Sequence, residues 1–342
     1  MNSKGCVFLE EGINFDLNKV TGCCISHNDG RGLPILIEGY TCEPIDWEKL
    51  FDKKAQRVAE QKEKTIYDCE NCYHLSDYEF KNERKISQFH FSNCRICNAK
   101  CIYCGSENNS LDYNYDLYPV IKDLFDKGYY KPGGEATFQG GEPTLMKNFD
   151  ELVNLFITSG TSVRIHSNGI KFSNTVYEAL KNNTGKTVIS IDSGCSKTYK
   201  KIKTVDGFET VCSNIEKYAE ASKDNIILKY IIVPGYNDNL DEIDKFFNLV
   251  KKFGIKTVAL DIEVVYAMKY ENKYVSPHIY LIADYFEHIA EQSGVNVLTY
   301  SFLSYVMKNR KTEKSSLIKN RFLYNLYIKT KTESKKNLKY GT

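Results

Sequence analysis

The sequence predicts an α/β protein built as a partial (β/α)6 TIM-like barrel with a cysteine-rich N-terminal extension and a helical, basic C-terminal region. Two observations lead to this fold class. Between residues 85 and 270, short runs rich in β-branched and aromatic residues alternate with amphipathic segments of helical period. Such alternation forms a parallel sheet with helices outside it, and 342 residues suffice for one large core with an appendage.

The predicted elements follow one another in the order expected for such a barrel. Strands are expected at 86–91, 135–139, 162–166, 187–192, 226–233 and 257–264. Helices are expected at 116–128, 148–160, 173–183, 208–223 and 239–254. A charged helix from Trp47 precedes the barrel, and a helix at 278–294 with a short strand or helix start at 295–302 follows it. The chain thus divides into an N-terminal extension (1–84), a barrel core (85–270) and a C-terminal region (271–342).

Composition and charge exclude several classes of protein. Hydrophobic residues make up 42% and charged residues 26%, which is typical of soluble globular chains and excludes a collagen-like or wholly disordered build. No run reaches about 18 apolar residues, and the acidic start MNSKGCVFLEEGINF lacks the apolar core of a secretory signal. We therefore expect a cytoplasmic protein without a membrane partner. The basic tail from Lys308 is interpreted as a solvated surface.

The cysteines are clustered, since ten of the twelve lie in the first 104 residues. In a reducing compartment such clustering favours metal or iron–sulfur ligation over disulfides. Directly after the first barrel strand, Cys97, Cys101 and Cys104 have the spacing C-x3-C-x2-C. Three thiolates from one loop hold three irons of a four-iron cubane and leave the fourth iron open. The alternative is a zinc site or an electron-transfer cluster that Cys94 closes as fourth ligand.

A second motif follows the next predicted strand, which runs into FQGGEPTL. Gln139, Gly140, Gly141 and Glu142 are therefore expected at the same rim of the barrel as the cysteine loop. The two glycines allow a ligand to approach the backbone closely, and Glu142 offers a carboxylate acceptor to an ammonium group. Alone, GGEP is more often a plain turn. Beside the cysteine triplet it predicts a cofactor site.

On these motifs the chain resembles the radical S-adenosylmethionine (radical SAM) superfamily over residues 86–265. The resemblance implies a [4Fe-4S] cluster on Cys97, Cys101 and Cys104 whose fourth iron is chelated by S-adenosylmethionine. The turn HSNG (166–169) and the segments SIDSG (190–194) and KYIIVPGYND (229–238) resemble secondary motifs of the family. The cofactor-binding residues that it implies are Tyr103, Gln139, Gly140, Gly141, Glu142, Ser167, Asn168, Ser190, Asp192, Val233 and Asn237.

Several of these residues also have a structural interpretation. HSNG is compatible with a simple β-turn, and we interpret His166 as structural. Asp192 and Asn237 are each compatible with a helix N-cap. Cys195 and Cys212 are interpreted as packing residues.

The resemblance implies an enzyme in which the reduced cluster cleaves S-adenosylmethionine to methionine and a 5′-deoxyadenosyl radical, and the radical removes hydrogen from the substrate. The implied partners are a reductant such as flavodoxin or ferredoxin and a peptide, sugar or small-molecule substrate. A non-enzymatic iron–sulfur or zinc protein is one alternative. An RNA-modifying member is another, weakened because the basic tail lacks a recognisable RNA-binding motif; we do not expect a nucleic-acid partner.

The N-terminal cysteines form a separate group of candidates. SIDSG is similar to the peptide-modifying and sulfatase-maturing (SPASM-type) subgroup, which carries extra cluster cysteines after the barrel, whereas this chain has none after Cys212. The candidate ligands of an auxiliary site are instead Cys23, Cys24, Cys42, Cys69 and Cys72. A second [4Fe-4S] cluster, a zinc site and unmetallated thiols remain open at this point.

Overall fold

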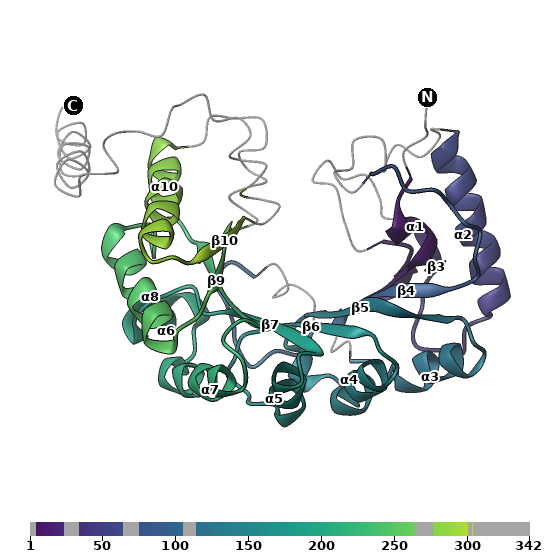
Figure 1. Cartoon of the computed structure of the whole chain (residues 1–342), viewed down its shortest axis with the longest axis horizontal. Helices are drawn as coiled ribbons and strands as arrows, with labels where there is room; N and C mark the ends of the chain where they lie inside the picture. The colour runs from purple at the N-terminus through teal and green to yellow at the C-terminus, as the bar shows by residue number, and fades with distance from the viewer. Residues whose placement is uncertain are drawn as a thin grey trace, which may run out of the picture. The chain divides into compact units, whose positions relative to one another are not determined.

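The computed structural model describes residues 5–23, 34–63, 75–104, 114–263, 276–299 and 303 (Figure 1). By their contacts, the residues fall into two units. Unit 1 comprises Met1–Ser190 and Glu209–Ile227, and unit 2 comprises Ile191–Phe208 and Leu228–Thr342. Unit 1 groups the N-terminal region with the first half of the predicted barrel, so its boundaries differ from the domain limits suggested by the sequence pattern.

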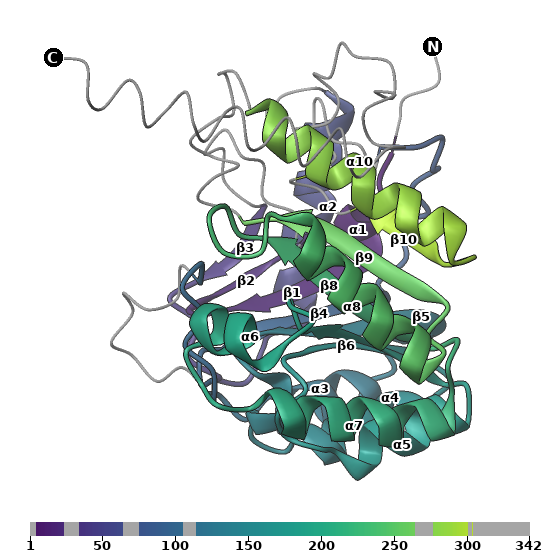
Figure 2. The same ribbon diagram turned by 90° about the vertical axis from the view of Figure 1, so that its left-hand side faces the viewer.

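Unit 1 is organised on a sheet with the strand order β7-β6-β5-β4-β1-β2-β3. The strands are β1 (Gly12–Asp16), β2 (Lys19–Thr21), β3 (Ile35–Glu38), β4 (Ile86–Cys94), β5 (Tyr130–Gly140), β6 (Ser162–Ser167) and β7 (Gly185–Ser190). Strands β4 to β7 and β1 pair in parallel, while β1, β2 and β3 pair antiparallel. The N-terminal strands therefore extend the parallel sheet at its β4 edge, where Figure 2 shows β1 beside β4.

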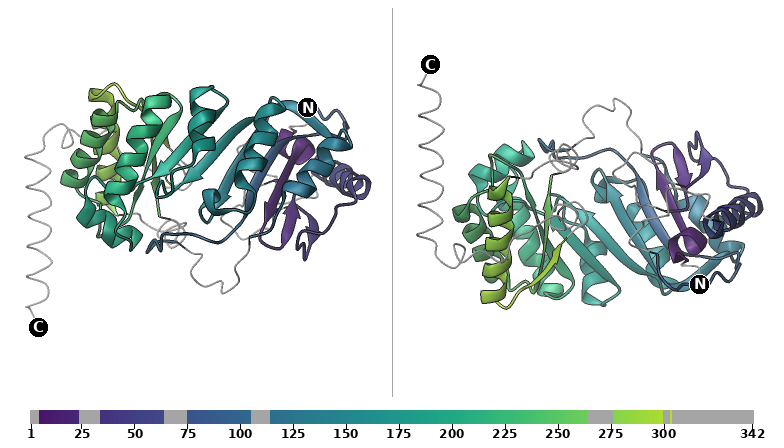
Figure 3. Two further views of the ribbon diagram at one scale, coloured as in Figure 1. Left: turned by 90° about the horizontal axis from the view of Figure 1, so that it is seen from below. Right: turned by 90° about the horizontal axis from the view of Figure 1, so that it is seen from above.

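The helices of unit 1 include three that cover one face of this sheet. The elements are α1 (Val7–Glu11), α2 (Trp47–Lys62), α3 (Tyr118–Asp126), η3 (Pro143–Leu145), α4 (Phe149–Thr158), α5 (Asn174–Lys181) and α7 (Phe208–Ala221), whose first residue belongs to unit 2. Figures 1 and 3 show α3, α4 and α5 on the same face of β4–β7. Phe156 of α4 packs against Phe89, Phe91 and Phe138 of the sheet. These aromatic side chains form the core between the sheet and α4.

The opposite face of β4, β5 and β6 is polar. Side chains alternate along a strand, so His90, Thr137 and Arg164 point away from the helices that cover their neighbours. The register places Thr137 opposite both His90 and Arg164. Glu135 accepts two hydrogen bonds from Arg164, at 2.9 and 2.8 Å. The sheet thus presents a half-exposed ion pair on the side opposite these helices, while His90 is buried against Phe8.

Unit 2 contains the last three strands, in the order β10-β9-β8. Its elements are α6 (Ser196–Lys203), β8 (Ile226–Ile232), α8 (Leu240–Phe253), β9 (Thr257–Ile262), α10 (Pro277–Gln292) and β10 (Asn296–Thr299); the first two residues of β8 belong to unit 1. Tyr230 of β8 packs against Phe246 of α8 and Phe286 of α10. These rings form the core of the unit.

The predicted α/β class is confirmed, because all six expected strands and the helices between them are present. Three N-terminal strands were not expected. β1 is buried along most of its length, so it lacks the polar–apolar alternation by which a half-exposed strand is recognised. In the part of the chain that the structure describes, no helix has the length and apolar character needed to cross a membrane.

Candidate cofactor site

The cysteine loop leaves the end of β4 and carries three sulfurs of the predicted cluster. Cys97 and Cys104 are exposed and Cys101 is half-buried, and a turn bond joins the Cys104 N–H to the Cys101 carbonyl at 2.9 Å. The Cys97 sulfur accepts hydrogen bonds from the Ala99 N–H at 3.4 Å and the Asn168 amide at 3.5 Å. Such donors stabilise thiolate and cluster sulfur, so the loop fits an iron–sulfur cluster.

The pKa of the Cys97 thiol depends on the groups that surround it. Partial burial raises the pKa of the Cys97 thiol, and the N–H donors of Ala99 and Asn168 oppose that shift. Cys104 lies within electrostatic range of the same thiol. Among the described residues no three potential ligands converge on one ion position. A cubane does not require such convergence, because each cysteine binds a different iron.

Cys94 has surroundings unlike those of Cys97. It is fully buried in β4, and its thiol donates to the carbonyl oxygens of Ile96 at 3.6 Å and Glu142 at 3.9 Å. Burial raises the pKa of Cys94 to about 11. In this arrangement the Cys94 thiol is bonded to backbone carbonyls, which gives no support to a closed cluster or zinc site with Cys94 as the fourth ligand.

Gly140 and Gly141 join the end of β5 to the start of the cysteine loop. Gly140 has φ +106°, and a Cβ there would lie 2.7 Å from the Cys94 carbonyl oxygen. A Cβ on Gly141 would overlap the carbonyl oxygen of Ile96. The N–H groups of Gly141 and Glu142 donate to these two carbonyls at 2.6 and 2.8 Å. The sequence suggested that the glycines make room for a ligand; here the chain that approaches them is the cysteine loop itself.

The Glu142 carboxylate is buried, with no exposed surface. It accepts hydrogen bonds from the Thr144 hydroxyl (2.8 Å) and N–H (3.3 Å), from the Ser167 hydroxyl (2.9 Å) and from the Asn168 N–H (2.7 Å). It therefore ties the end of β5 to the turn after β6. The expectation that this carboxylate stands open to an ammonium group is not met, since the accessible groups of the motif are at Gln139, Gly140 and Gly141.

The HSNG turn is bound to the cysteine loop. Asn168 donates from its side-chain amide to the side-chain oxygen Oδ1 of Asn98 at 2.7 Å as well as to Cys97, and its own side-chain oxygen accepts from the Ile170 N–H at 2.9 Å. Gly169 has φ +75°, as a tight turn requires. Asn98 and Thr144 are functional neighbours that the sequence analysis missed, because neither belongs to a spacing pattern.

Three further predicted residues of unit 1 lie on strand ends or in the loop. Gln139 donates to the Ser92 hydroxyl at 3.0 Å. Tyr103 is half-buried between the second and third cysteines, and Ser190 is the half-buried last residue of β7.

The three predicted residues of unit 2 form a network of their own. The Asp192 carboxylate pairs with the ammonium of Lys203 and accepts from the Ile231 N–H at 2.8 Å. Asn237 donates to the carbonyls of Asp192 (2.9 Å) and Ile231 (2.8 Å) and accepts from the Val233 N–H (2.7 Å). Asp192 and Asn237 have no exposed surface. Their contacts fix the end of β8.

Neither of the two residues caps a helix. The N-cap of α6 is Cys195 and that of α8 is Asn239, whose side chain accepts from the Glu242 N–H. The helix-cap interpretation of Asp192 and Asn237 is therefore wrong. Cys195 is half-buried and donates to Glu242 at 3.4 Å, and Cys212 is buried in the core as expected.

The N-terminal cysteines separate into two places in unit 1. Cys42 donates its thiol to the Asp116 carbonyl at 2.9 Å, and burial followed by the nearby Asp116 carboxylate raises its pKa. Cys23 lies within electrostatic range of Lys54 on α2. Cys24, Cys69 and Cys72 lie outside the described residues.

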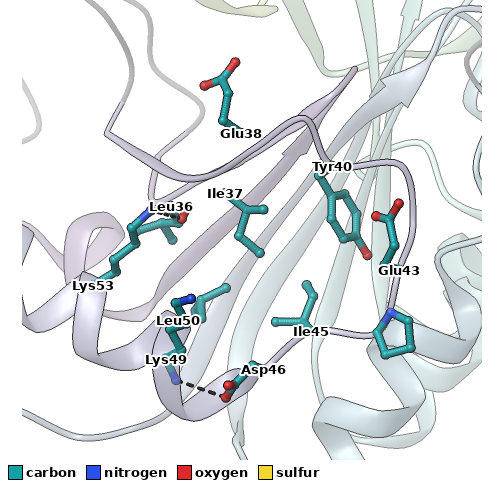
Figure 4. A pocket seen from close by; sticks show the side chains of 11 residues that line it. Leu36, Ile37, Glu38, Tyr40, Glu43, Ile45, Asp46, Lys49, Leu50 and Lys53 are labelled. Carbon is teal, nitrogen blue, oxygen red and sulfur yellow. Dashed lines mark hydrogen bonds between the residues drawn. The ribbon is translucent and has the colours of Figure 1, made fainter.

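A pocket of about 360 Å³ lies between β3 and α2. Figure 4 shows Leu50 on one side of it and Tyr40 on the other, with Ile45 between them. Glu43 also lines this pocket. Hydrogen bonds from the hydroxyl and the N–H of Thr41 lower the pKa of the Glu43 carboxyl. None of the predicted cofactor residues lines this pocket.

Residues 94–250 match the Radical SAM superfamily. This part of the chain is a radical SAM domain. Proteins similar to it include GTP 3′,8-cyclases of two Clostridium botulinum strains. The Okra strain protein is 28% identical over 207 residues, covering 57% of this chain and 63% of the relative. The Hall strain protein is 30% identical over 184 residues, covering 51% and 56%. The chain thus spans less than two thirds of the length of these curated relatives.

Solved structures of other proteins share the fold. Streptococcus suis SuiB bound to its precursor peptide SuiA covers 81% of this chain and 62% of its own, with a TM-score of 0.53 and 15% identity. SuiB bound to S-adenosylmethionine gives a TM-score of 0.52 at 16% identity, covering 81% and 61%. This likeness confirms the partial-barrel fold class.

Proposed function

We propose that this protein is an enzyme that reductively cleaves S-adenosylmethionine at a [4Fe-4S] cluster held by Cys97, Cys101 and Cys104. When bound, the cluster and S-adenosylmethionine supply a carbon radical able to remove hydrogen from an unactivated C–H bond. The observation that carries the proposal is the difference between the surroundings of Cys97 and those of Cys94. Amide donors converge on the Cys97 sulfur, whereas the Cys94 thiol is buried and bonded to backbone carbonyls.

The chain's own residues would shape this site in three ways. Ala99 and Asn168 donate to the Cys97 sulfur and favour its charged form. Gly140 and Gly141 hold the cysteine loop against β5. Because the Glu142 carboxylate is saturated, we assign the methionyl ammonium to backbone carbonyls of the accessible 139–141 segment. Glu142 then orients that segment instead of binding the ammonium itself.

We further propose a polar substrate, held against the face of β5 and β6 that lies opposite α3–α5. In the described part of unit 1 this face carries the half-exposed Glu135–Arg164 pair, whereas at β4 the ring of Phe8 from α1 packs on His90. The carboxylate of Glu135 neutralises the guanidinium of Arg164, whereas a nucleoside triphosphate needs several unneutralised basic groups. The face therefore favours a peptide or a sugar over a triphosphate. The reductant would be a flavodoxin or a ferredoxin.

The experiment is anaerobic reconstitution with iron and sulfide, followed by dithionite reduction in the presence of S-adenosylmethionine. Wild type should form 5′-deoxyadenosine and methionine in equal amounts. Replacing Cys97, Cys101 and Cys104 together by Ala should abolish both products. Cys94→Ala is the matched control from the same segment and should retain cleavage. Undiminished cleavage in the triple variant, or its loss in Cys94→Ala with the iron content and fold intact, would overturn the proposal.

A further inference from the structure

Asn168, in the turn after β6, uses every polar atom of its side chain, and one of its hydrogen bonds reaches a cluster cysteine. Its backbone N–H donates to the Glu142 carboxylate at 2.7 Å, and its side-chain oxygen accepts from the Ile170 N–H at 2.9 Å. The side-chain nitrogen carries two hydrogens. It donates to the Cys97 sulfur at 3.5 Å and to the side-chain oxygen of Asn98 at 2.7 Å. Asn168 is therefore fixed through both its backbone and its side chain.

The two hydrogen bonds of this nitrogen differ in strength. The bond to Asn98 has the short length of a good amide–oxygen hydrogen bond, whereas the sulfur of Cys97 is a weak acceptor at a longer distance. The bond from the Ile170 N–H holds only the oxygen end of the Asn168 amide. The nitrogen end is therefore placed mainly by Asn98, and the hydrogen that faces the sulfur follows from that placement.

Asn98 belongs to the cysteine loop itself, since it directly follows Cys97. Its side chain is exposed, whereas Asn168 is only 9% exposed. Glu142 holds the backbone of Asn168 and Asn98 holds its side chain. The position of the turn and the direction of the amide thus have separate supports, and the exposed support can be removed without opening a cavity in the core.

A hydrogen bond to a cluster cysteine affects how readily the cluster is reduced. Reduction adds negative charge, part of which lies on sulfur, so an N–H donor stabilises the reduced form more than the oxidised form. Cys97 accepts from two such donors, the backbone N–H of Ala99 and the side-chain amide of Asn168. The first is fixed by the loop backbone, whereas the second depends on how a side chain is oriented.

We propose that Asn98 is a positioning residue that raises the midpoint potential of the cluster by holding the Asn168 amide on the Cys97 sulfur. This role rests on the proposed [4Fe-4S] cluster of Cys97, Cys101 and Cys104. Asn98 acts on the sulfur through Asn168. A higher potential makes reduction by a flavodoxin or a ferredoxin more favourable, so Asn98 would promote the electron transfer on which cleavage depends.

The test is a redox titration of the full chain, followed by electron paramagnetic resonance after anaerobic reconstitution with iron and sulfide. The cluster of this site is identified as the one whose signal changes when S-adenosylmethionine is added afterwards. Asn98→Ala should lower the equilibrium constant for one-electron reduction at least threefold. This is a shift of about 28 mV toward more negative potential, since a tenfold change corresponds to about 59 mV.

Two further single variants frame this measurement. Asn168→Ala removes the donor itself and should shift the potential in the same direction, by at least as much as Asn98→Ala. Asn154→Ala is the matched control, because it makes the same substitution at an exposed position of α4, and it should keep the wild-type potential.

A double variant tests whether Asn98 acts through Asn168. In the Asn168→Ala background, Asn98→Ala should not shift the potential further, because the donor that Asn98 positions is already absent. Additive shifts in the double variant would show that Asn98 affects the cluster by another route, which overturns the positioning role.

The single variant can also contradict the proposal. A potential of Asn98→Ala equal to that of Asn154→Ala overturns it, and so does an Asn98→Ala protein that folds but retains no iron, since Asn98 then holds the cluster instead of adjusting its potential. Wild-type cleavage of S-adenosylmethionine is unaffected by either outcome. A wild-type protein without iron that depends on Cys97, Cys101 and Cys104 would overturn the proposed function together with this role.

Discussion

Removing the Glu142 carboxylate should destabilise the protein more than it weakens cofactor recognition directly. Glu142→Ala leaves the hydroxyls of Thr144 and Ser167 and the N–H of Asn168 without the acceptor that they share. Hydrogen bonds to a charged group contribute about 1.5–3 kcal/mol each. Because hydroxyls can rotate toward new partners, we expect a total loss of about 3–5 kcal/mol in the free energy of unfolding.

This loss translates into a measurable change in thermal stability. The unfolding entropy of about 2.1 cal/mol/K per residue gives about 0.7 kcal/mol/K for this chain, so Tm should fall by roughly 4–7 °C. Circular dichroism of the apoprotein measures it without any contribution from the cofactor. Glu135→Ala is the control on the same strand, and its half-exposed ion pair should cost at most about 1 kcal/mol.

The opposite outcome would refute the structural role of Glu142. If Glu142→Ala melts within 1–2 °C of wild type, roughly the error expected from the estimate above, while binding of S-adenosylmethionine to the reconstituted protein is lost, then the carboxylate serves the ligand and not the strand ends. Calorimetric titration under anaerobic conditions gives that binding constant. Glu142→Gln refines the result, because it keeps one acceptor oxygen and should lie between wild type and Ala in stability.

Three further predictions test other parts of the molecule. Gly141→Ala should lower the iron retained after reconstitution at least twofold, since the added methyl overlaps the backbone of the cysteine loop; iron equal to wild type would contradict the close approach. Lys203→Met should destabilise the protein by about 3–5 kcal/mol because it leaves a buried, unpaired carboxylate, and adding Asp192→Asn should restore part of the loss in urea unfolding. Although burial of the carboxyl opposes this shift, Arg164 lowers the pKa of Glu135 below its ordinary value of 4.5. The stability that this ion pair contributes is therefore complete above about pH 4.5 and is lost as the pH falls through the lower folded pKa. This pH dependence of stability should be weaker in Arg164→Met.

The sequence was sufficient for the parts of the site that depend on spacing and strand order. Parallel strands end on one edge of a sheet, so placing the cysteine loop after β4 and the glycines after β5 already brings them together. The structure bears this out through the bonds from Gly141 and Glu142 to the loop. Element order could be predicted because periodic apolar patterns define each strand and helix independently of its neighbours.

Side-chain direction could not be predicted in the same way. Whether Glu142 faces solvent or the protein depends on donors from Thr144, Ser167 and Asn168, which no single periodicity relates to it. The three N-terminal strands were missed for a different reason, because β1 is buried along most of its length and such a strand gives no alternating signal.

The glycine–glutamate motif and the cysteine loop therefore form one hydrogen-bonded unit. Backbone bonds from Gly141 and Glu142 hold the start of the loop, and the Glu142 carboxylate holds the turn whose Asn168 amide reaches the Cys97 sulfur. A change at Glu142 is thus transmitted to the sulfur through a single intervening residue. It follows that Asn168→Ala should reproduce the effect of Glu142→Ala on the cluster potential while leaving most of the stability intact, because it removes the donor to sulfur but keeps the backbone N–H that the carboxylate binds. Equal stability losses in the two variants would show that the side chain of Asn168, and not the carboxylate, fixes the turn.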